Sequence, residues 1–151
     1  MDLRSMLKAM KVKQILPPEL KNNGAFVGLS YIDTLGLGAV LFLINLGVTD
    51  VIVGSTDTST PLLVEECDTF DGSYTAVEDA ELSAVLGAGD DGEVNGIFVD
   101  LAKTHKRYMR VQAPTAGNST GANLQITALG FPADVLPVDA AGMGLTELIE
   151  A

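Results

Sequence analysis

The sequence has one cysteine, one histidine and no tryptophan, and these shortages argue against several kinds of site. A single cysteine excludes an intrachain disulfide framework and a zinc cluster held by several thiolates. A single histidine excludes a metal site built from several imidazoles. Aromatic residues make up only 5% of the chain, so a sugar-binding cleft of stacked rings is poorly supplied.

Basic residues are missing from more than half of the chain, since no lysine or arginine occurs between Lys21 and Lys103. The formal net charge is −11 and the isoelectric point is about 4.2. This charge predicts that neither nucleic acid nor an anionic membrane is a partner. Residues 1–21 reverse the sign, with five basic and two acidic residues. Such an asymmetry is typical of a basic segment with a partner of its own.

The chain is long enough, at 151 residues, to form one domain with a sizeable core, and 47% hydrophobic residues exclude a disordered chain. Between residues 24 and 132, short apolar runs alternate with Gly, Asp, Asn, Ser and Thr. This pattern predicts an all-β fold, an antiparallel β-sandwich of jelly-roll-like form. The predicted strands are residues 26–34, 39–47, 50–54, 61–67, 73–77, 94–102, 106–113 and 122–130.

Local patterns add detail to this prediction. Asp71-Gly72 predicts a hairpin turn, because both residues tolerate positive φ. Residues 106–113 and 122–130 each alternate between apolar and polar side chains, which predicts a long hairpin with one buried face. The apolar run at residues 39–48 is too short for a membrane helix and predicts a buried strand. Residues 76–86 fit either a helical excursion or an edge strand with a loop.

The two ends of the sequence differ in composition from the segment that contains the predicted strands. Residues 1–23 are predicted to form an N-terminal arm, with helical spacing of its apolar residues and a helix stop at Pro17-Pro18. The body is then residues 24–132. Residues 133–151 are predicted to form a C-terminal tail that does not pack as sheet. Its apolar stripe of Leu145, Leu148 and Ile149 could dock on a neighbour or on the body.

No motif for catalysis is present. His105 lies among lysine and arginine residues without a Gly-x-Ser-x-Gly nucleophile, which predicts a surface or turn histidine. Cys67 lies beside Glu65 and Glu66, whose charges disfavour a thiolate, so it is expected to be a small buried group. The sequence therefore predicts no enzyme activity, no catalytic residue and no cofactor.

Acidic loops raise the question of calcium, which prefers six to eight oxygen ligands. Neither loop has the spacing of an EF-hand, so solvated turns are the favoured interpretation, no metal site is predicted, and calcium binding stays open. The acidic residues of these loops are Asp68, Asp71, Asp90, Asp91 and Glu93.

Several blocks of residues 10–135 resemble a family of small virion proteins of tailed bacteriophages, of the capsid decoration or cement type. The blocks are Gln14-Ile15-Leu16-Pro17-Pro18, then YIDTLG and AVLFLINLG, then LLVEECDTFDGSYTAV, then KRYMRVQAPTAGNSTGANLQITALGFP. Residues 1–13 are more basic, and residues 133–151 longer, than this family leads one to expect. The resemblance supplies no catalytic residue.

The resemblance implies a protein made in the host cytoplasm that binds the exterior of the virion capsid as a homotrimer. Its implied partners are the major capsid protein and further copies of itself. The arm then offers the contact residues, which are Met1, Leu3, Arg4, Met6, Leu7, Lys8, Met10, Lys11 and Lys13. The alternatives are another virion structural protein, at the head–tail junction or on the tail surface, and a carbohydrate- or receptor-binding module.

Overall fold

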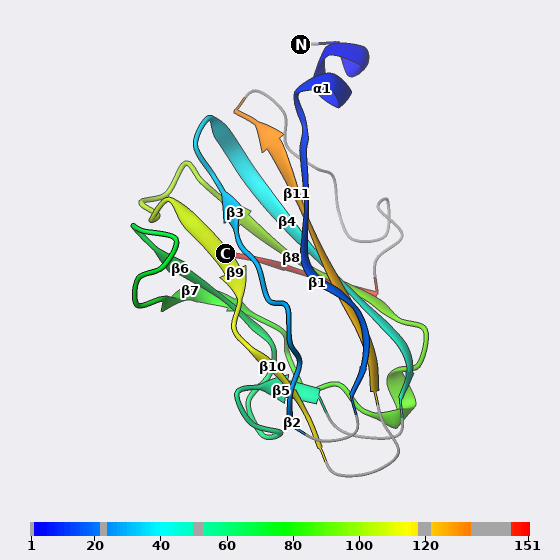
Figure 1. Ribbon diagram of the computed structural model, residues 1–151. Coiled ribbons are helices and arrows are strands. Elements are labelled where there is room, and N and C mark those ends of the chain that lie inside the picture. Colours follow the sequence, from blue (N-terminus) through cyan, green and yellow to red (C-terminus); the bar gives the residue numbers. More distant parts are fainter. Residues whose placement is uncertain (1, 22–23, 50–52, 118–121, 134–145) are drawn as a thin grey trace.

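The computed structural model describes residues 2–21, 24–49, 53–117, 122–133 and 146–151. These residues form an all-β protein with one short α-helix, as the sequence predicts (Figure 1). The elements are α1 (Leu3–Ala9), β1 (Lys11–Lys21), β2 (Gly24–Ala25), β3 (Ile32–Asp33), β4 (Leu37–Thr49), β5 (Val53–Ser55), β6 (Leu63–Cys67), β7 (Thr75–Glu81), a 3₁₀ turn η1 (Ala88–Asp90), β8 (Val94–Asp100), β9 (Tyr108–Val111), β10 (Pro114–Ala116), β11 (Ala122–Pro132) and β12 (Glu147–Glu150).

The largest sheet has the strand order β1-β11-β4-β8-β12. Its central strand β4 contains the apolar run of the sequence, and the prediction of a buried strand is confirmed. Phe42 and Ile44 are fully buried in the main core, and Leu41 is fully buried on the opposite face. A strand that is covered on both faces needs apolar residues at successive positions, which accounts for the run.

Two smaller sheets complete the described part, with strand orders β3-β9-β6-β7 and β2-β10-β5. The four-stranded sheet shares one core with the five-stranded sheet, because Val64 and Met109 lie in the same buried cluster as Phe42. In β9, Met109 is buried whereas Tyr108 and Arg110 are partly exposed. The predicted alternation is therefore confirmed for this strand.

The strand pairs agree with the sequence in one hairpin and differ in another. β6 and β7 pair antiparallel around Asp71-Gly72, so this hairpin is confirmed, and residues 75–81 form an edge strand rather than a helix. The prediction that residues 106–113 and 122–130 form one long hairpin is wrong. β9 pairs with β3 and β6, whereas β11 pairs with β1 and β4. The chain leaves the four-stranded sheet after Val111 and enters β10 at Pro114 before it reaches β11.

Residues 26–34 form no continuous strand, because the chain passes Gly28 at φ +82° between the short strands β2 and β3. Such a backbone angle favours glycine and interrupts regular pairing. Of the predicted strand at residues 50–54, only residues 53–54 lie within the described part, where they belong to β5.

The N-terminal arm is shorter than predicted, because β1 is part of the body. This strand pairs with β11 from Lys11 to Lys21, and Ile15 and Leu16 are fully buried. One of two irregularities in its register, between Leu16 and Glu19, accommodates Pro17 and Pro18. Proline lacks a backbone donor, which an edge strand tolerates on its free side. Within the described residues of this end, only α1 projects beyond the sheets (Figure 1).

The prediction that the C-terminal tail does not pack as sheet is also wrong. β12 adds to the edge of the five-stranded sheet, parallel to β8. Leu148 and Ile149 pack against different hydrophobic clusters, because adjacent strand residues point to opposite faces. Of the two docking sites predicted for this stripe, a neighbour or the body, Leu148 and Ile149 therefore occupy the body, while Leu145 lies outside the described residues.

Candidate interaction surface

Helix α1 presents an uncovered apolar stripe. Leu3 is 68% exposed and Leu7 is 58% exposed, and no residue of the helix is buried. The Asp2 carboxylate caps the first turn by accepting hydrogen bonds from the Ser5 amide and hydroxyl, which lower the pKa of Asp2. A seven-residue helix that buries none of its residues is marginal in water, so contact with a partner would stabilise it.

The structure brings most of the predicted contact residues together at this end. Arg4 and Lys8 are exposed on α1, and Lys11 and Lys13 are exposed where β1 begins. The two methionines differ from the leucines: Met6 is half-buried, and Met10 packs against the apolar cluster on the outer face of the five-stranded sheet. Met1 lies outside the described residues.

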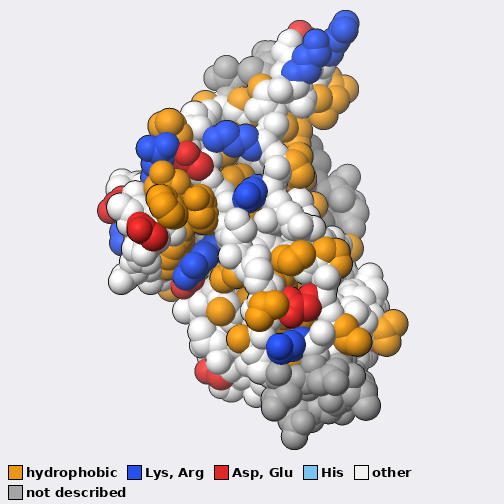
Figure 2. Space-filling model, in the orientation of Figure 1, with side chains coloured by type: hydrophobic (Ala, Val, Ile, Leu, Met, Phe, Trp, Pro, Cys, Tyr) orange, Lys and Arg blue, Asp and Glu red, His pale blue; other side chains and the backbone are white. Residues whose placement is uncertain are grey.

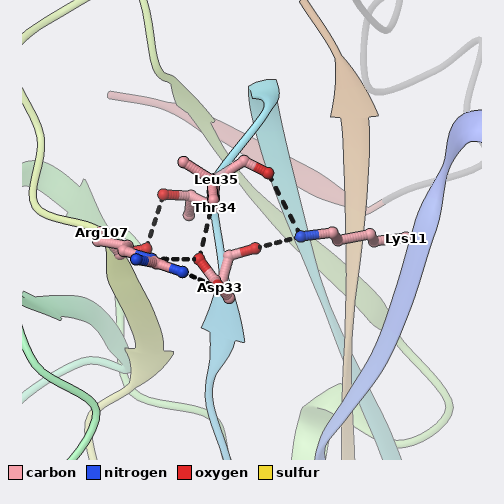
Figure 3. Close-up of polar contacts among 5 residues, drawn as sticks. All are labelled: Lys11, Asp33, Thr34, Leu35 and Arg107. Atoms are coloured by element: carbon pink, nitrogen blue, oxygen red, sulfur yellow. Dashed lines mark hydrogen bonds and ion pairs between the residues drawn. The ribbon is translucent and has the colours of Figure 1, made fainter.

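Hydrogen bonds from Lys11 link β1 to the end of β3 and the turn that follows it (Figure 3). Its Nζ donates to the carbonyl oxygens of Asp33 at 2.9 Å and Leu35 at 3.4 Å. On the other side of this turn, Thr34 donates from both its amide and its hydroxyl to the carbonyl oxygen of Arg107. The turn is thereby held between the two largest sheets.

Asp33 forms a two-pronged ion pair with Arg107. The Asp33 Oδ1 and Oδ2 atoms accept from Arg107 Nε at 2.9 Å and Nη2 at 2.8 Å. These hydrogen bonds are the main reason that the pKa of Asp33 falls to about 2. The Asp33 carboxylate also accepts from the Leu35 amide at 3.0 Å, so one aspartate fixes both the turn and the guanidinium.

We expect Asp33→Asn to lower the free energy of unfolding at pH 7 by about 0.5–1 kcal/mol, because both partners are partly exposed. A lowered pKa contributes stability above the unfolded value of 3.8, and this contribution is lost as the pH falls to about 2. Urea unfolding at pH 7 and pH 2 measures the difference, with the exposed Asp71→Asn as the control. A penalty of the same size at both pH values would contradict this assignment.

Three aromatic rings from distant segments form an exposed cluster. Tyr31 stacks on Phe70 with centroids 5.7 Å apart, and Tyr108 meets Tyr31 edge-on at 5.4 Å. Phe70 is 54% exposed, and the Arg107 guanidinium lies 5.2 Å from the Tyr108 ring centroid. Sequence reasoning missed this cluster. The outward alternation of Tyr108 was the only local signal, and it does not reveal the rings that Tyr108 meets.

A groove between β1 and β3 joins α1 to the aromatic cluster. Its lining residues are Lys11, Val12, Lys13, Tyr31, Ile32 and Asp33, and Val12 is 69% exposed. Figure 2 shows basic side chains on α1 and along the middle of this face, beside hydrophobic side chains over the four-stranded sheet. We name this surface the basic-aromatic face, and it consists of Leu3, Arg4, Leu7, Lys8, Lys11, Val12, Lys13, Tyr31, Phe70, Arg107 and Tyr108.

Of the two predicted settings for His105, a surface or a turn, the structure places it in the loop before β9, where only 10% of its side chain is exposed. Its Nδ1 lies 3.0 Å from Glu66 Oε2, which also accepts from the Lys106 amide. The pair holds the loop before β9 in place. The buried Nε2 has no hydrogen-bond partner among the described residues. Cys67 is buried, as predicted.

In the acidic loop at residues 87–93, two carboxylates accept hydrogen bonds from backbone amides. Asp90 accepts from the Gly87 amide, and Asp91 accepts from the Thr49 amide. Within the described ranges, no three or more His, Cys, Asp and Glu side chains gather in an arrangement that could hold a metal ion. In the same ranges, the structure contains no helix with the length and hydropathy of a membrane span.

Comparison with protein-family models, with curated proteins and with solved structures finds no match to this chain. The function is therefore inferred from the residues and geometry of the basic-aromatic face.

Proposed function

We propose that this protein is a capsid decoration protein of a tailed bacteriophage, which binds the outside of the major capsid protein shell and stabilises the head. The observation that carries the proposal is α1. This helix projects from the sheets with Leu3 and Leu7 uncovered, and it carries basic residues on a chain of net charge −11. An apolar, basic projection on an acidic body is suited to attachment.

The body supports this role as a rigid base for the helix. Its two larger sheets share one core, which is compatible with a jelly-roll-like sandwich. The strand β1 continues directly from α1 and is anchored by Ile15 and Leu16. A load on the helix is therefore transmitted to the hydrogen-bonded edge of the five-stranded sheet rather than to a loose linker.

The attachment combines two physical terms. Burial of the leucines contributes roughly 25 cal/mol per Å² of apolar surface, before the cost of ordering the helix. The lysines and Arg4 add association rate and register against an acidic shell surface. In the proposed homotrimer, three helices bind together, and linked sites can strengthen binding by about 10²–10⁴. The rest of the surface is acidic, and repulsion between like charges keeps neighbouring virions apart.

Deletion of residues 1–9 tests this proposal. The deletion stops before Lys11, because β1 belongs to the sheet. We expect an unchanged thermal transition and at least about 100-fold weaker co-sedimentation with undecorated capsid shells, since two leucine anchors are lost. Leu3→Glu combined with Leu7→Glu gives the same loss, whereas Leu20→Glu, 60% exposed near the other end of β1, does not. Unchanged saturation of the shells by the truncated protein would refute the proposal.

A second candidate function is carbohydrate binding, which the exposed aromatic cluster favours. A sugar could stack on Phe70, beside the guanidinium of Arg107 and the hydroxyls of two tyrosines. A glycan array with wild-type protein and Phe70→Ala distinguishes carbohydrate binding from capsid decoration. Sugar binding that is lost in this variant, without loss of shell attachment, would assign a receptor-binding role to the cluster. Electron microscopy of the virion separates the capsid exterior from the tail as the location.

A further inference from the structure

The groove between β1 and β3 lies between two sheet edges. β1 is the terminal strand of the five-stranded sheet, and β3 is the terminal strand of the four-stranded sheet. The hollow between them has a volume of about 350 Å³. An edge strand presents backbone N–H and C=O groups that are free to pair with another chain.

Both sides of the groove indicate where such pairing could occur. On β3, the carbonyl oxygen of Asp33 accepts from the ammonium of Lys11 instead of from a neighbouring strand. On β1, the carbonyl oxygen of Ile15 accepts from the Ser30 amide at 2.7 Å, so the chain's own loop closes the groove at that point. The open stretch is therefore the first part of β1, at Lys11, Val12 and Lys13.

The side chains of this stretch define the chemistry of the occupant. Val12 is 69% exposed and offers an apolar contact, and the partly buried Tyr31 offers a second one from the opposite wall. Lys13 is an exposed cation on a chain that carries 20 acidic residues, and the ammonium of Lys11, which donates to the carbonyl oxygens of Asp33 and Leu35, adds positive charge beside it. Charge complementarity therefore favours a segment that alternates apolar and acidic side chains.

We propose that the groove binds an extended acidic segment of the partner polypeptide, which adds as a strand to the edge of β1. Main-chain hydrogen bonds to the strand provide affinity, and the side chains that point toward Val12, Tyr31 and the lysines provide selectivity. The identity of the partner as the capsid protein rests on the proposed function, whereas the chemistry of the groove does not. The proposal thus adds a second contact to the one made by α1.

The probe is a short capped peptide of alternating glutamate and valine, titrated into the full-length ¹⁵N-labelled protein. We expect amide shifts at residues 11–13 and 31–33. Val12→Glu and Lys13→Glu are each expected to lower the affinity for the peptide about tenfold. Val12→Glu removes the apolar contact, and Lys13→Glu reverses a charge. The matched controls are Leu20→Glu and Lys21→Glu on the distal part of the same strand, which leave the affinity unchanged. A peptide of alternating lysine and valine is not bound.

Three outcomes would overturn the proposal: no saturable shift with the acidic peptide, shifts confined to other strands, or equal effects of the two pairs of variants. Loss of self-association in Val12→Glu, seen by sedimentation, would assign the groove to a second copy and overturn it as well. These results are separable from the test of α1. If deletion of residues 1–9 releases the protein from shells while the groove variants bind peptide normally, the groove proposal fails and the proposed function stands.

Discussion

Phe42→Ala is expected to lower the free energy of unfolding by about 4 kcal/mol, the largest effect of a single substitution that we predict. Phe42 is fully buried on the central strand of the five-stranded sheet, where it lies opposite Ala128 of β11 and Ile97 of β8. Both neighbouring strands are held by their own partners, so the sheet cannot collapse into the space that the ring leaves. The cost therefore includes a cavity as well as lost burial.

Urea denaturation followed by far-ultraviolet circular dichroism measures this change. Val48→Ala is the control, because Val48 lies on the same strand and is 74% exposed. We expect the control to change the free energy of unfolding by less than about 0.5 kcal/mol. Equal losses from the two substitutions would show that β4 is not central to the core.

Arg110→Ala is expected to lower the free energy of unfolding by about 3 kcal/mol, because it leaves the Glu65 carboxylate buried without its cation. Arg110 Nε donates to Glu65 Oε1 at 2.7 Å, and only 6% of the glutamate side chain is exposed. The guanidinium also lies 3.8 Å from the centroid of the Tyr74 ring. The expected loss lies at the lower end of the range for buried pairs, since 32% of the arginine side chain is exposed.

Two comparisons distinguish a buried charge from a general loss of contacts. Glu65→Gln combined with Arg110→Met removes both charges and is expected to recover most of the stability. Arg107→Ala breaks a more exposed ion pair and is expected to destabilise the protein much less than Arg110→Ala does. If Arg107→Ala and Arg110→Ala were equally destabilising, the burial of Glu65 would not be the cause.

Much of the sheet structure could be predicted from local sequence, because strand periodicity is a property of neighbouring residues. The run at residues 39–47, the alternation around Met109 and the Asp71-Gly72 turn all identify elements that the structure contains. The partners of these strands could not be predicted, because pairing depends on segments far away in sequence. The false hairpin between residues 106–113 and 122–130 joined two correctly predicted strands in the wrong way.

The candidate surface was predicted only in part. The helical spacing of Leu3 and Leu7 and the basic residues beside them are local signals, and α1 forms where they occur. Integration of β1 into the sheet was missed, since Pro17-Pro18 is typical of a linker and the pairing with β11 is not visible locally. The aromatic cluster joins residues 31, 70 and 108 and required the tertiary structure.

The pairing of Lys11 with Gly130 has a consequence for synthesis on the ribosome. β1 leaves the exit tunnel long before its partner β11 is made, so Ile15 and Leu16 stay unprotected until β11 has been translated. Folding dominated by such distant contacts takes milliseconds to seconds. The nascent chain thus exposes β1 until that point, and α1, which precedes β1, becomes a defined projection only after β11 has joined the sheet.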